Sequence, residues 1–229
     1  MLRAALLALL FAAPVQAEIA SARFTAPTNR YDHGILGDAI EYGALELTLT
    51  DGRRLQFTLP ETRVFEDLEP RLADLDGDGL VEVIVVETLM TKGAQLAVYT
   101  ETGKLAATPH LGRSHRWLAP IGMADLDGDG TVELAYIEKP HLSKILRIWQ
   151  LKGKKLHQVA NLTGLTNHQI GQDFISGGIR VCDGKTEIIT VDADWSHIMA
   201  TTFSKGKLTA KSLGPFIGQK SLKAALDCS

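Results

Sequence analysis

Short runs of apolar residues, separated by turns, recur along most of this chain. Between Pro70 and Leu151 these runs are rich in β-branched residues, as in Val81–Val86, and they are bounded by pairs such as Lys92-Gly93. β-branched residues favour strands, and glycine favours the tight turns between them. The order of an apolar strand, an acidic loop and further strands occurs twice, at a period of about 50 residues. Four short strands per unit, repeated at this period, are typical of a β-propeller blade.

The same rhythm continues more weakly on both sides of these two units. Downstream, Cys182–Glu187 aligns with Asp127–Glu133 with one residue missing, and further apolar runs follow it. Upstream, Gly37–Glu41 leads into two more apolar runs. The sequence therefore predicts an all-β protein, a β-propeller built from about four repeats of four short antiparallel strands. We expect one domain over residues 18–229, with approximate repeats at 24–65, 66–115, 116–167 and 168–229.

Two nearly identical acidic loops organise the central repeats, and they lie 51 residues apart (125 − 74). Each loop places four carboxylates within nine residues, with glycines between them that let the backbone curl tightly. Neighbouring carboxylates about 5 Å apart would repel by roughly 3 kcal/mol at an effective dielectric of about 20, unless a cation lies between them. Oxygen ligands at flexible spacing favour a hard ion, and calcium fits best. A pair of exposed acidic turns is the simpler alternative, but the identical spacing of the two copies argues against it.

Two features exclude an EF-hand. Its loop needs a bidentate acid at position twelve, where this chain has Val85 in one copy and Tyr136 in the other. It also needs a helix after the loop, whereas Val81–Val86 is typical of a strand. The acid at position nine, Glu82 or Glu133, therefore closes each loop.

The two acidic loops, each preceded by a short apolar strand, resemble the calcium loops of FG-GAP/VCBS repeats, which build integrin-α-type β-propellers. The chain departs from that family in lacking the Phe-Gly…Gly-Ala-Pro signature and in having four units rather than the usual seven. The resemblance implies that carboxylates at loop positions one, three, five and nine, with the carbonyl at position seven, hold one Ca²⁺ in each loop. The implied ligands of these two ions are Asp74, Asp76, Asp78, Leu80 and Glu82, and then Asp125, Asp127, Asp129, Thr131 and Glu133.

The first 17 residues have the pattern of a secretory signal peptide. Arg3 precedes the apolar run Ala4–Ala13, and Val15-Gln16-Ala17 provides a small-residue cleavage site. Because the run is too short to cross a bilayer, we expect export to a bacterial periplasm or the medium, without membrane insertion. The net charge is −3 for the whole chain and −4 without Arg3. No basic patch indicates nucleic-acid binding.

The chain has two cysteines, Cys182 and Cys228. In an exported protein an even number of cysteines favours a disulfide over a metal site. The bond would close a loop of 46 residues (228 − 182) and tie the C-terminal tail, Ser221–Ser229, to the last repeat. Two buried free thiols are the alternative.

A candidate ligand funnel is formed by polar and aromatic residues next to the expected inner strands. Connections into the inner strands of a propeller converge at one end of its channel, where Trp, Arg and His side chains would stack on and hydrogen-bond a sugar or peptide. Alternatively, the tryptophans pack between repeats and the histidines hydrogen-bond loop backbone. His197 and Asp194 are a candidate acid–base pair. The funnel candidates are His115, Arg116, Trp117, His168, Asp194, Trp195 and His197.

These features favour a non-catalytic function. No Gly-x-Ser-x-Gly, Ser-x-x-Lys or His-Glu-x-x-His motif occurs, so we expect no enzyme but a calcium-binding propeller that binds a protein or glycan of the cell envelope. A hydrolase or lyase that acts on polysaccharide, with its site in the funnel, is the alternative from another class. A structural subunit of a larger assembly is a third possibility. Clustered titratable groups in the channel would favour the enzyme, and a flat apolar face would favour assembly.

Overall fold

The computed structural model describes residues 17–229, so the predicted signal peptide lies outside the described residues except for Ala17. The described residues form three antiparallel sheets and one short helix, which confirms the all-β prediction. The first sheet contains β1 (Ile19–Thr28), β2 (Glu41–Leu49), β3 (Arg54–Thr58), β4 (Arg63–Phe65), β5 (Arg71–Ala73), β6 (Glu82–Leu89), β7 (Gly93–Thr100) and β8 (Gly103–Ala107). The second contains β9 (Leu118–Ala124), β10 (Glu133–Glu138), β11 (Ile145–Lys152) and β12 (Lys155–Thr163). The third contains β13 (Leu165–Thr166), β14 (Gly178–Cys182), β15 (Lys185–Asp192), β16 (His197–Ser204) and β17 (Lys207–Pro215), and α1 (Gln219–Leu226) follows it.

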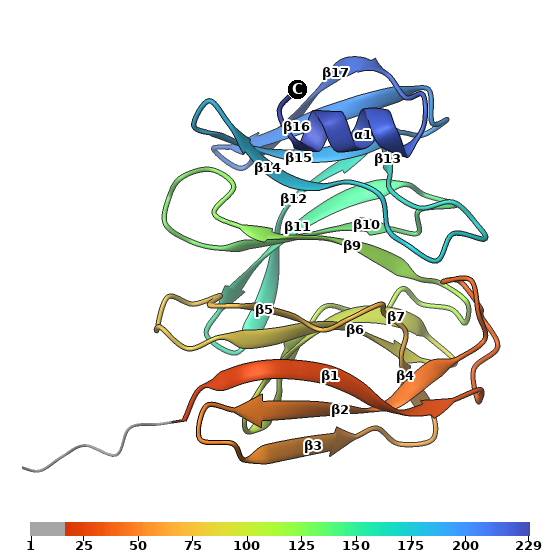
Figure 1. Ribbon diagram of the computed structural model, residues 1–229, viewed down its shortest axis with the longest axis vertical. Helices are drawn as coiled ribbons and strands as arrows, with labels where there is room; N and C mark the ends of the chain where they lie inside the picture. The colour runs from red at the N-terminus through yellow and green to blue at the C-terminus, as the bar shows by residue number, and fades with distance from the viewer. Residues whose placement is uncertain (1–16) are drawn as a thin grey trace, which may run out of the picture.

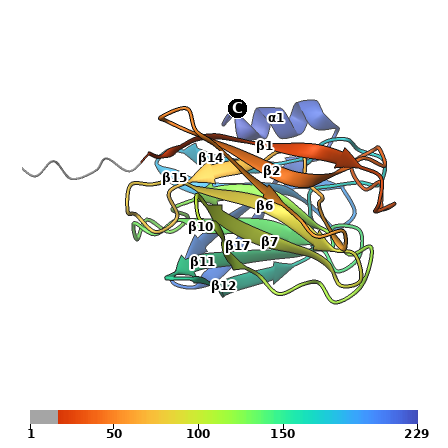
Figure 2. The ribbon, with the colours of Figure 1, turned by 90° about the horizontal axis from the view of Figure 1, so that it is seen from below.

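The sheets are curled and lie one above another in propeller-like layers (Figure 1). Most strands pair with their neighbours in sequence, in the order β9-β10-β11-β12 for example. One exception is β13, which pairs with β15 rather than β14. Another is β4, which pairs with both β2 and β6 and so joins β1–β3 and β5–β8 into a single hydrogen-bonded sheet. Figure 2 shows the same layers from below, with β11, β12 and β17 on the side away from α1.

Apolar side chains fill the space between layers, and the central strands contribute to two layers at once. Side chains alternate between the faces of a strand. In β6, Val83 and Val85 pack with residues of β2, whereas Ile84 and Val86 pack with residues of β9 and β10. β10 repeats the arrangement on its own two faces. The near-continuous apolar runs of the sequence are therefore strands that are buried on both sides.

The last sheet ends the stack with an apolar face that α1 covers. Ile188 of β15 faces the second sheet, whereas Ile189 and Val191 point to the other side. There they meet Leu222 and Ala225, the two buried residues of α1. At the other end of the stack, the surface is polar and carries a salt bridge between Arg23 and Glu46 with an N–O distance of 2.8 Å. Stacked repeats need polar or covered ends to avoid exposing a core.

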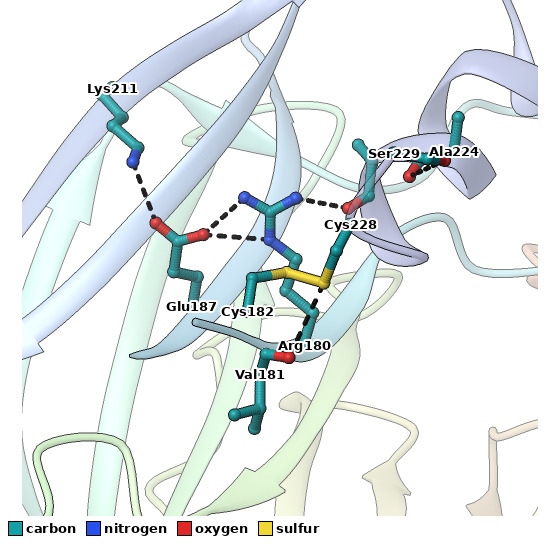
Figure 3. The surroundings of a disulfide bond; sticks show 9 residues. Arg180, Val181, Cys182, Glu187, Lys211, Ala224, Cys228 and Ser229 are labelled. Atoms are coloured by element: carbon teal, nitrogen blue, oxygen red, sulfur yellow. Dashed lines mark hydrogen bonds and ion pairs between the residues drawn. A yellow bond between two sulfur atoms is a disulfide. The ribbon is translucent and has the colours of Figure 1, made fainter. Parts of the chain in front are cut away.

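The predicted disulfide is present and fastens this covering helix. Cys182 at the end of β14 is bonded to Cys228, just after α1, with 5.9 Å between the two Cα atoms (Figure 3). Beside it, Arg180 donates to the carboxylate of Glu187 (Figure 3). Arg180 also donates to the carbonyl oxygen of Ala225. The helix is thus held by a covalent bond, a charged hydrogen bond and an apolar contact.

The structure differs from the sequence-based alignment of the last repeat. Cys182 and Lys185 face each other in the β14–β15 register, so only Asp183 and Gly184 form the turn. Both turn residues have positive φ, 50° and 72°, which is the type I′ geometry that an Asp-Gly pair favours. The segment aligned with Asp127–Glu133 is therefore a two-residue hairpin turn rather than a shortened acidic loop.

Within residues 17–229, no helix is long and apolar enough to span a membrane. The disulfide is the only cysteine pairing that the described residues contain, and they include no free cysteine. Disulfides persist in oxidising compartments.

Reduction of the disulfide should destabilise the protein, because it frees a chain segment of 46 residues. We expect the free energy of unfolding to fall by about 4 kcal/mol, measured by urea denaturation with and without reductant. The double variant Cys182→Ala, Cys228→Ala is the control and should not respond to reductant. Alkylation of both thiols in the untreated native protein would contradict the pairing.

Candidate functional site

The loops at the two edges of the stack carry different chemistry. The turns between β5 and β6 and between β9 and β10, which contain the acidic loops, lie on the left of Figure 1. The longer connections 29–40, 108–117, 139–144 and 167–177 lie on the right. The molecule therefore has an acidic edge and, opposite to it, an edge with long loops.

The two acidic loops share one pattern of hydrogen bonds. In the first loop Asp74 accepts from the backbone N–H groups of Gly77 and Gly79, at 2.8 and 3.0 Å. In the second, Asp125 accepts from Gly128 and Gly130, at 2.7 and 3.0 Å. All four glycines have φ between 77° and 88°, a range that other residues adopt only with strain. The sequence repeat is thus a repeat of backbone conformation.

The glutamate at position nine of each loop accepts a hydrogen bond from the second residue of the same loop. Glu82 accepts a hydrogen bond from the backbone N–H of Leu75, and Glu133 accepts one from Leu126, both at 2.8 Å. Burial, and then the neighbouring aspartates, raise the pKa of Glu82. Burial also raises the pKa of Glu133. Burial and charge repulsion of this kind disfavour a bare carboxylate.

Carboxylates of both loops come close enough together to hold a metal ion. In each group, one carboxylate oxygen per residue lies within 4.8 Å of the others. Oδ1 of Asp127 is buried and has no hydrogen-bond partner among the described residues. A carboxylate oxygen that could ligate an ion is therefore free at this position. The groups are Asp74, Asp76 and Asp78 in the first loop, and Asp125, Asp127 and Glu133 in the second.

The opposite edge contains a small pocket to which three loops contribute, which we call the histidine pocket. Its histidines come from loops far apart in the sequence, and Lys139 and Arg116 add positive charge. Trp117 forms its floor, with 2% of its surface exposed, and donates from Nε1 to the carbonyl oxygen of Glu66 at 2.9 Å. The pocket is lined by His33, Ile35, His115, Arg116, Trp117, Lys139, Pro140, His141 and Leu142.

A buried carboxylate supports one side of the histidine pocket. Glu66 is fully buried, and one oxygen of its carboxylate contacts Nδ1 of His33. The other oxygen accepts from the hydroxyl of Thr88 at 2.5 Å. Nearby, burial and the charge of Glu66 raise the pKa of Glu41 to about 9. Glu41 is therefore neutral at pH 7, while His33 has a carboxylate beside it.

His115 is the exposed histidine of the pocket, and its position is fixed. Its backbone N–H donates to the hydroxyl of Tyr31 at 2.8 Å, and the two rings stack with centroids 5.1 Å apart. The imidazole Nε2 lies 3.2 Å from Oδ1 of Asp32. Burial, and then the charge of Glu66, raise the pKa of Tyr31 to about 12. His115 thus has an aromatic support on one side and a carboxylate that orients its ring.

His141 of the pocket lining forms a hydrogen-bonded pair with His168, which lies outside the lining. Nε2 of His141 lies 3.0 Å from Nδ1 of His168, and Nε2 of His168 lies 3.1 Å from the carbonyl oxygen of Gln172. The His168 ring also meets the edge of Trp117. Burial lowers the pKa of His168 to about 4 and also lowers the pKa of His141. This pair is therefore neutral at pH 7.

The structure brings together only part of the predicted funnel. His115, Arg116 and Trp117 line the histidine pocket, and His168 supports it from behind. Trp195 packs on Phe216, next to α1. His197 pairs with Asp192 rather than with Asp194, at 3.0 Å. None of Asp194, Trp195 and His197 lines the pocket.

Three residues of this site were missed by the sequence-based selection: Glu66, Lys139 and His141. His33 was indicated by the sequence, because it stands in the polar segment Tyr31-Asp32-His33, which enters the first repeat. His141 follows Pro140 in the β10–β11 connection, where a titratable group after a turn is a usable signal. Glu66 has no such signal, because only the packing of Trp117 and Thr88 places it here.

His168 should make the free energy of unfolding depend on pH. The folded protein binds a proton at His168 only below about pH 4, whereas an unfolded histidine binds one below 6.5. Stability due to this group is therefore present above pH 6.5 and is lost as the pH falls towards 4, by up to about 3 kcal/mol. The difference in unfolding free energy between the wild type and His168→Gln, from urea denaturation at several pH values, should shrink over this range. A difference that does not change with pH would contradict the assignment.

Comparison with solved structures finds partial matches to larger proteins. The rhamnogalacturonan lyase YesW matches with a TM-score of 0.47 and 15% identity, over 78% of this chain and 43% of that one. The exotype rhamnogalacturonan lyase YesX matches with a TM-score of 0.42 and 14% identity, over 73% of this chain and 40% of that one. The rhamnogalacturonan lyase PL11 of Bacillus licheniformis matches with a TM-score of 0.44 and 17% identity, over 84% and 47%. The chain spans less than half the length of each.

All three of these structures are enzymes. They contradict the sequence-based prediction that the chain is not an enzyme, and that prediction is not retained. No curated protein sequence matches the chain.

A comparison with family models finds one match, to the FG-GAP-like repeat, over residues 74–136. The matched segment begins at the first acidic loop and ends within β10, just after the second. It lies within the part of the chain on which the resemblance to FG-GAP/VCBS repeats rests. That resemblance is confirmed, because residues 74–136 match the model of the FG-GAP-like repeat.

Proposed function

We propose that this chain cleaves an acidic polysaccharide by acid–base chemistry in the histidine pocket. The observation that carries the proposal is the arrangement of His115, which is exposed, oriented by Asp32 and next to the pocket cations Arg116 and Lys139. An imidazole with a carboxylate partner is a suitable general base near neutral pH. Cationic side chains beside it would bind the carboxylate of a uronic acid.

Elimination fits this arrangement better than hydrolysis. Hydrolysis of a glycoside generally needs two carboxyl groups that both reach the sugar. The pocket lining that the structure describes contains no carboxyl group. Glu41 and Glu66 are 3% and 0% exposed, which leaves Asp32, held by His115, as a single exposed carboxylate beside the pocket. Elimination from a uronate needs one base and a positive charge at the sugar carboxylate, and the pocket has both. The neutral Glu41 and the His33–Glu66 pair would then act as support for the loop.

In the proposed step, His115 takes the proton from the carbon next to the sugar carboxylate. Arg116 and Lys139 stabilise the charge that develops on that carboxylate. The bond between the neighbouring carbon and the glycosidic oxygen then breaks, and a carbon–carbon double bond forms in its place. The departing oxygen takes up a proton from water, and His115 returns the proton that it took to the solvent. One polysaccharide chain gives two products, of which one ends in an unsaturated uronate.

The backbone at this site is strained in a way that supports a functional role. His115 and Lys139 adopt positive φ values of 53° and 47°. Such conformations are uncommon for residues other than glycine, and they gather at active sites because the surrounding structure has to enforce them. Both residues line the histidine pocket.

We also propose that the acidic loops bind calcium and that the chain is exported. The support is the pair of carboxylate groups, the unpartnered Oδ1 of Asp127 and the all-oxygen donor set. Glu82 and Asp129, with the carbonyls of Leu80 and Thr131, would complete the two ligand sets. An ion there would offset the repulsion between the carboxylates and pin the two strands that each loop connects. The disulfide and the N-terminal sequence pattern support export to the periplasm or the medium.

Replacement of the proposed base tests the activity. With polymers of uronic acids, including rhamnogalacturonan, the wild type should produce the ultraviolet absorbance of an unsaturated uronate, and His115→Gln should lower the rate by at least about 100-fold. The matched control is His157→Gln, at an exposed histidine of β12. It should leave the rate unchanged. New reducing ends without ultraviolet absorbance would indicate hydrolysis instead, and equal rates in the two variants would exclude His115 as the base.

Calcium binding is tested by stoichiometry. Isothermal titration should find two ions per chain with dissociation constants of about 10⁻⁴ to 10⁻³ M, and calcium should raise the melting temperature. Asp76→Asn and Asp127→Asn should each remove one ion and leave the other, because the two loops share no ligand. Asp183→Asn, in the two-residue turn, is the control and should keep both. A stoichiometry of one, or of three or more, would contradict the assignment.

A further inference from the structure

A second groove lies next to the histidine pocket, between the β8–β9 connection and the strands β10, β11 and β12. Its volume is about 300 Å³, at the lower end of the range for small-molecule sites. Polar and charged side chains make up most of its lining. The lining residues are Pro109, His110, Leu111, Tyr136, Glu138, Lys139, Arg147, Trp149 and Gln158.

The groove and the histidine pocket share one wall, Lys139. The backbone of this residue is held firmly, because its N–H donates to the carbonyl oxygen of Trp117 at 3.0 Å. Its own carbonyl oxygen accepts from the N–H groups of Leu142 and Lys144, at 2.8 and 3.1 Å. The groove and the histidine pocket therefore adjoin at a residue with a well-held backbone.

The charge of the groove suits an anionic ligand. Glu138 is the only carboxylate in its lining, and two cations share it. Nζ of Lys139 lies 3.0 Å from one oxygen of Glu138, and Arg147 donates to the other. Arg147 also donates to the side-chain oxygen of Gln158, at 2.7 Å. The cluster keeps a net positive charge beside an exposed amide.

One buried polar atom in this lining is unpartnered. Trp149 is 7% exposed, and its Nε1 has no hydrogen-bond acceptor among the described residues. The hydroxyl of Tyr136 lies near it but not in hydrogen-bonding geometry. A buried indole N–H normally has a partner. A hydroxyl or carboxylate oxygen of a ligand in the groove would supply one.

We propose that this groove is a second subsite, which binds the uronic-acid residues of an acidic polysaccharide that extend beyond the histidine pocket. Arg147 contacts the sugar carboxylate, and the Trp149 N–H contacts a sugar oxygen. This inference rests on the proposed function, because the histidine pocket has to hold the neighbouring part of the same chain. With such a subsite, the protein would bind long oligosaccharides more tightly than short ones.

Calorimetric titration with a digalacturonate and a hexagalacturonate tests the subsite. The wild type should bind the hexamer at least about tenfold more tightly than the dimer, which corresponds to about 1.4 kcal/mol. Gln158→Glu adds a negative charge to the groove and should remove this gain while leaving dimer binding unchanged. Trp149→Phe keeps an aromatic ring but removes the indole N–H, and should reduce the gain in affinity of the hexamer over the dimer. Gln56→Glu is the matched control, because it makes the same change at an exposed position of β3.

Each outcome separates the subsite from the proposed function. If the hexamer binds no more tightly than the dimer, or if Gln158→Glu behaves like Gln56→Glu, the subsite is wrong and the histidine pocket stands. If neither oligosaccharide binds to the wild type, the preference for an acidic sugar is wrong, and the subsite is overturned with it.

Discussion

The structure depends on strands that are buried on both faces. A strand such as β6, with Val83 and Val85 on one side and Ile84 and Val86 on the other, is stable only if a layer of apolar side chains lies above and below it. Burying one such side chain contributes about 1.5–3 kcal/mol, so each layer depends on its neighbours. The stack must therefore end in surfaces that need no further layer. A polar surface with the Arg23–Glu46 salt bridge provides one end, and α1 provides the other.

Each of the last three repeats has a glutamate near the start of its second strand, and the negative charge of this glutamate is accommodated in two different ways. Glu82 and Glu133 close acidic loops and have raised pKa values. The corresponding residue of the last layer is Glu187, which lies opposite Arg180. Burial alone would raise its pKa, but hydrogen bonds from Arg180 and Lys211 lower it. There an internal guanidinium takes the place that a metal ion is proposed to fill in the central layers, and the loop shortens to the Asp183-Gly184 turn.

Periodicity predicted most of the strands, because strand formation here is a local property of apolar runs and turns. The acidic loops and the disulfide were also predictable, since the loops repeat within the sequence and only one cysteine pairing exists. The helix α1 was missed because it has few apolar positions. Their role becomes clear only in the structure, where they pack on the outer face of the last sheet. The histidine pocket was found in part. Its contacts join residues as far apart as Tyr31 and His115, and no spacing rule relates such positions. The predicted Asp194–His197 pair does not form, because the turn directs Asp192 towards the N–H groups of Ser196 and His197.

The central claim is that an acidic sugar binds among the histidines at the edge with the long loops. The chain has seven histidines, and their positions allow one measurement to test this claim. The measurement is the NMR spectrum of the imidazole groups during titration with oligogalacturonate. His33, His115 and His141 line the pocket, whereas His157 and His197 lie outside it. The account predicts that the signals of the three pocket histidines shift and saturate together while those of His157 and His197 stay fixed. Unchanged pocket signals, or equal shifts at all histidines, would contradict it.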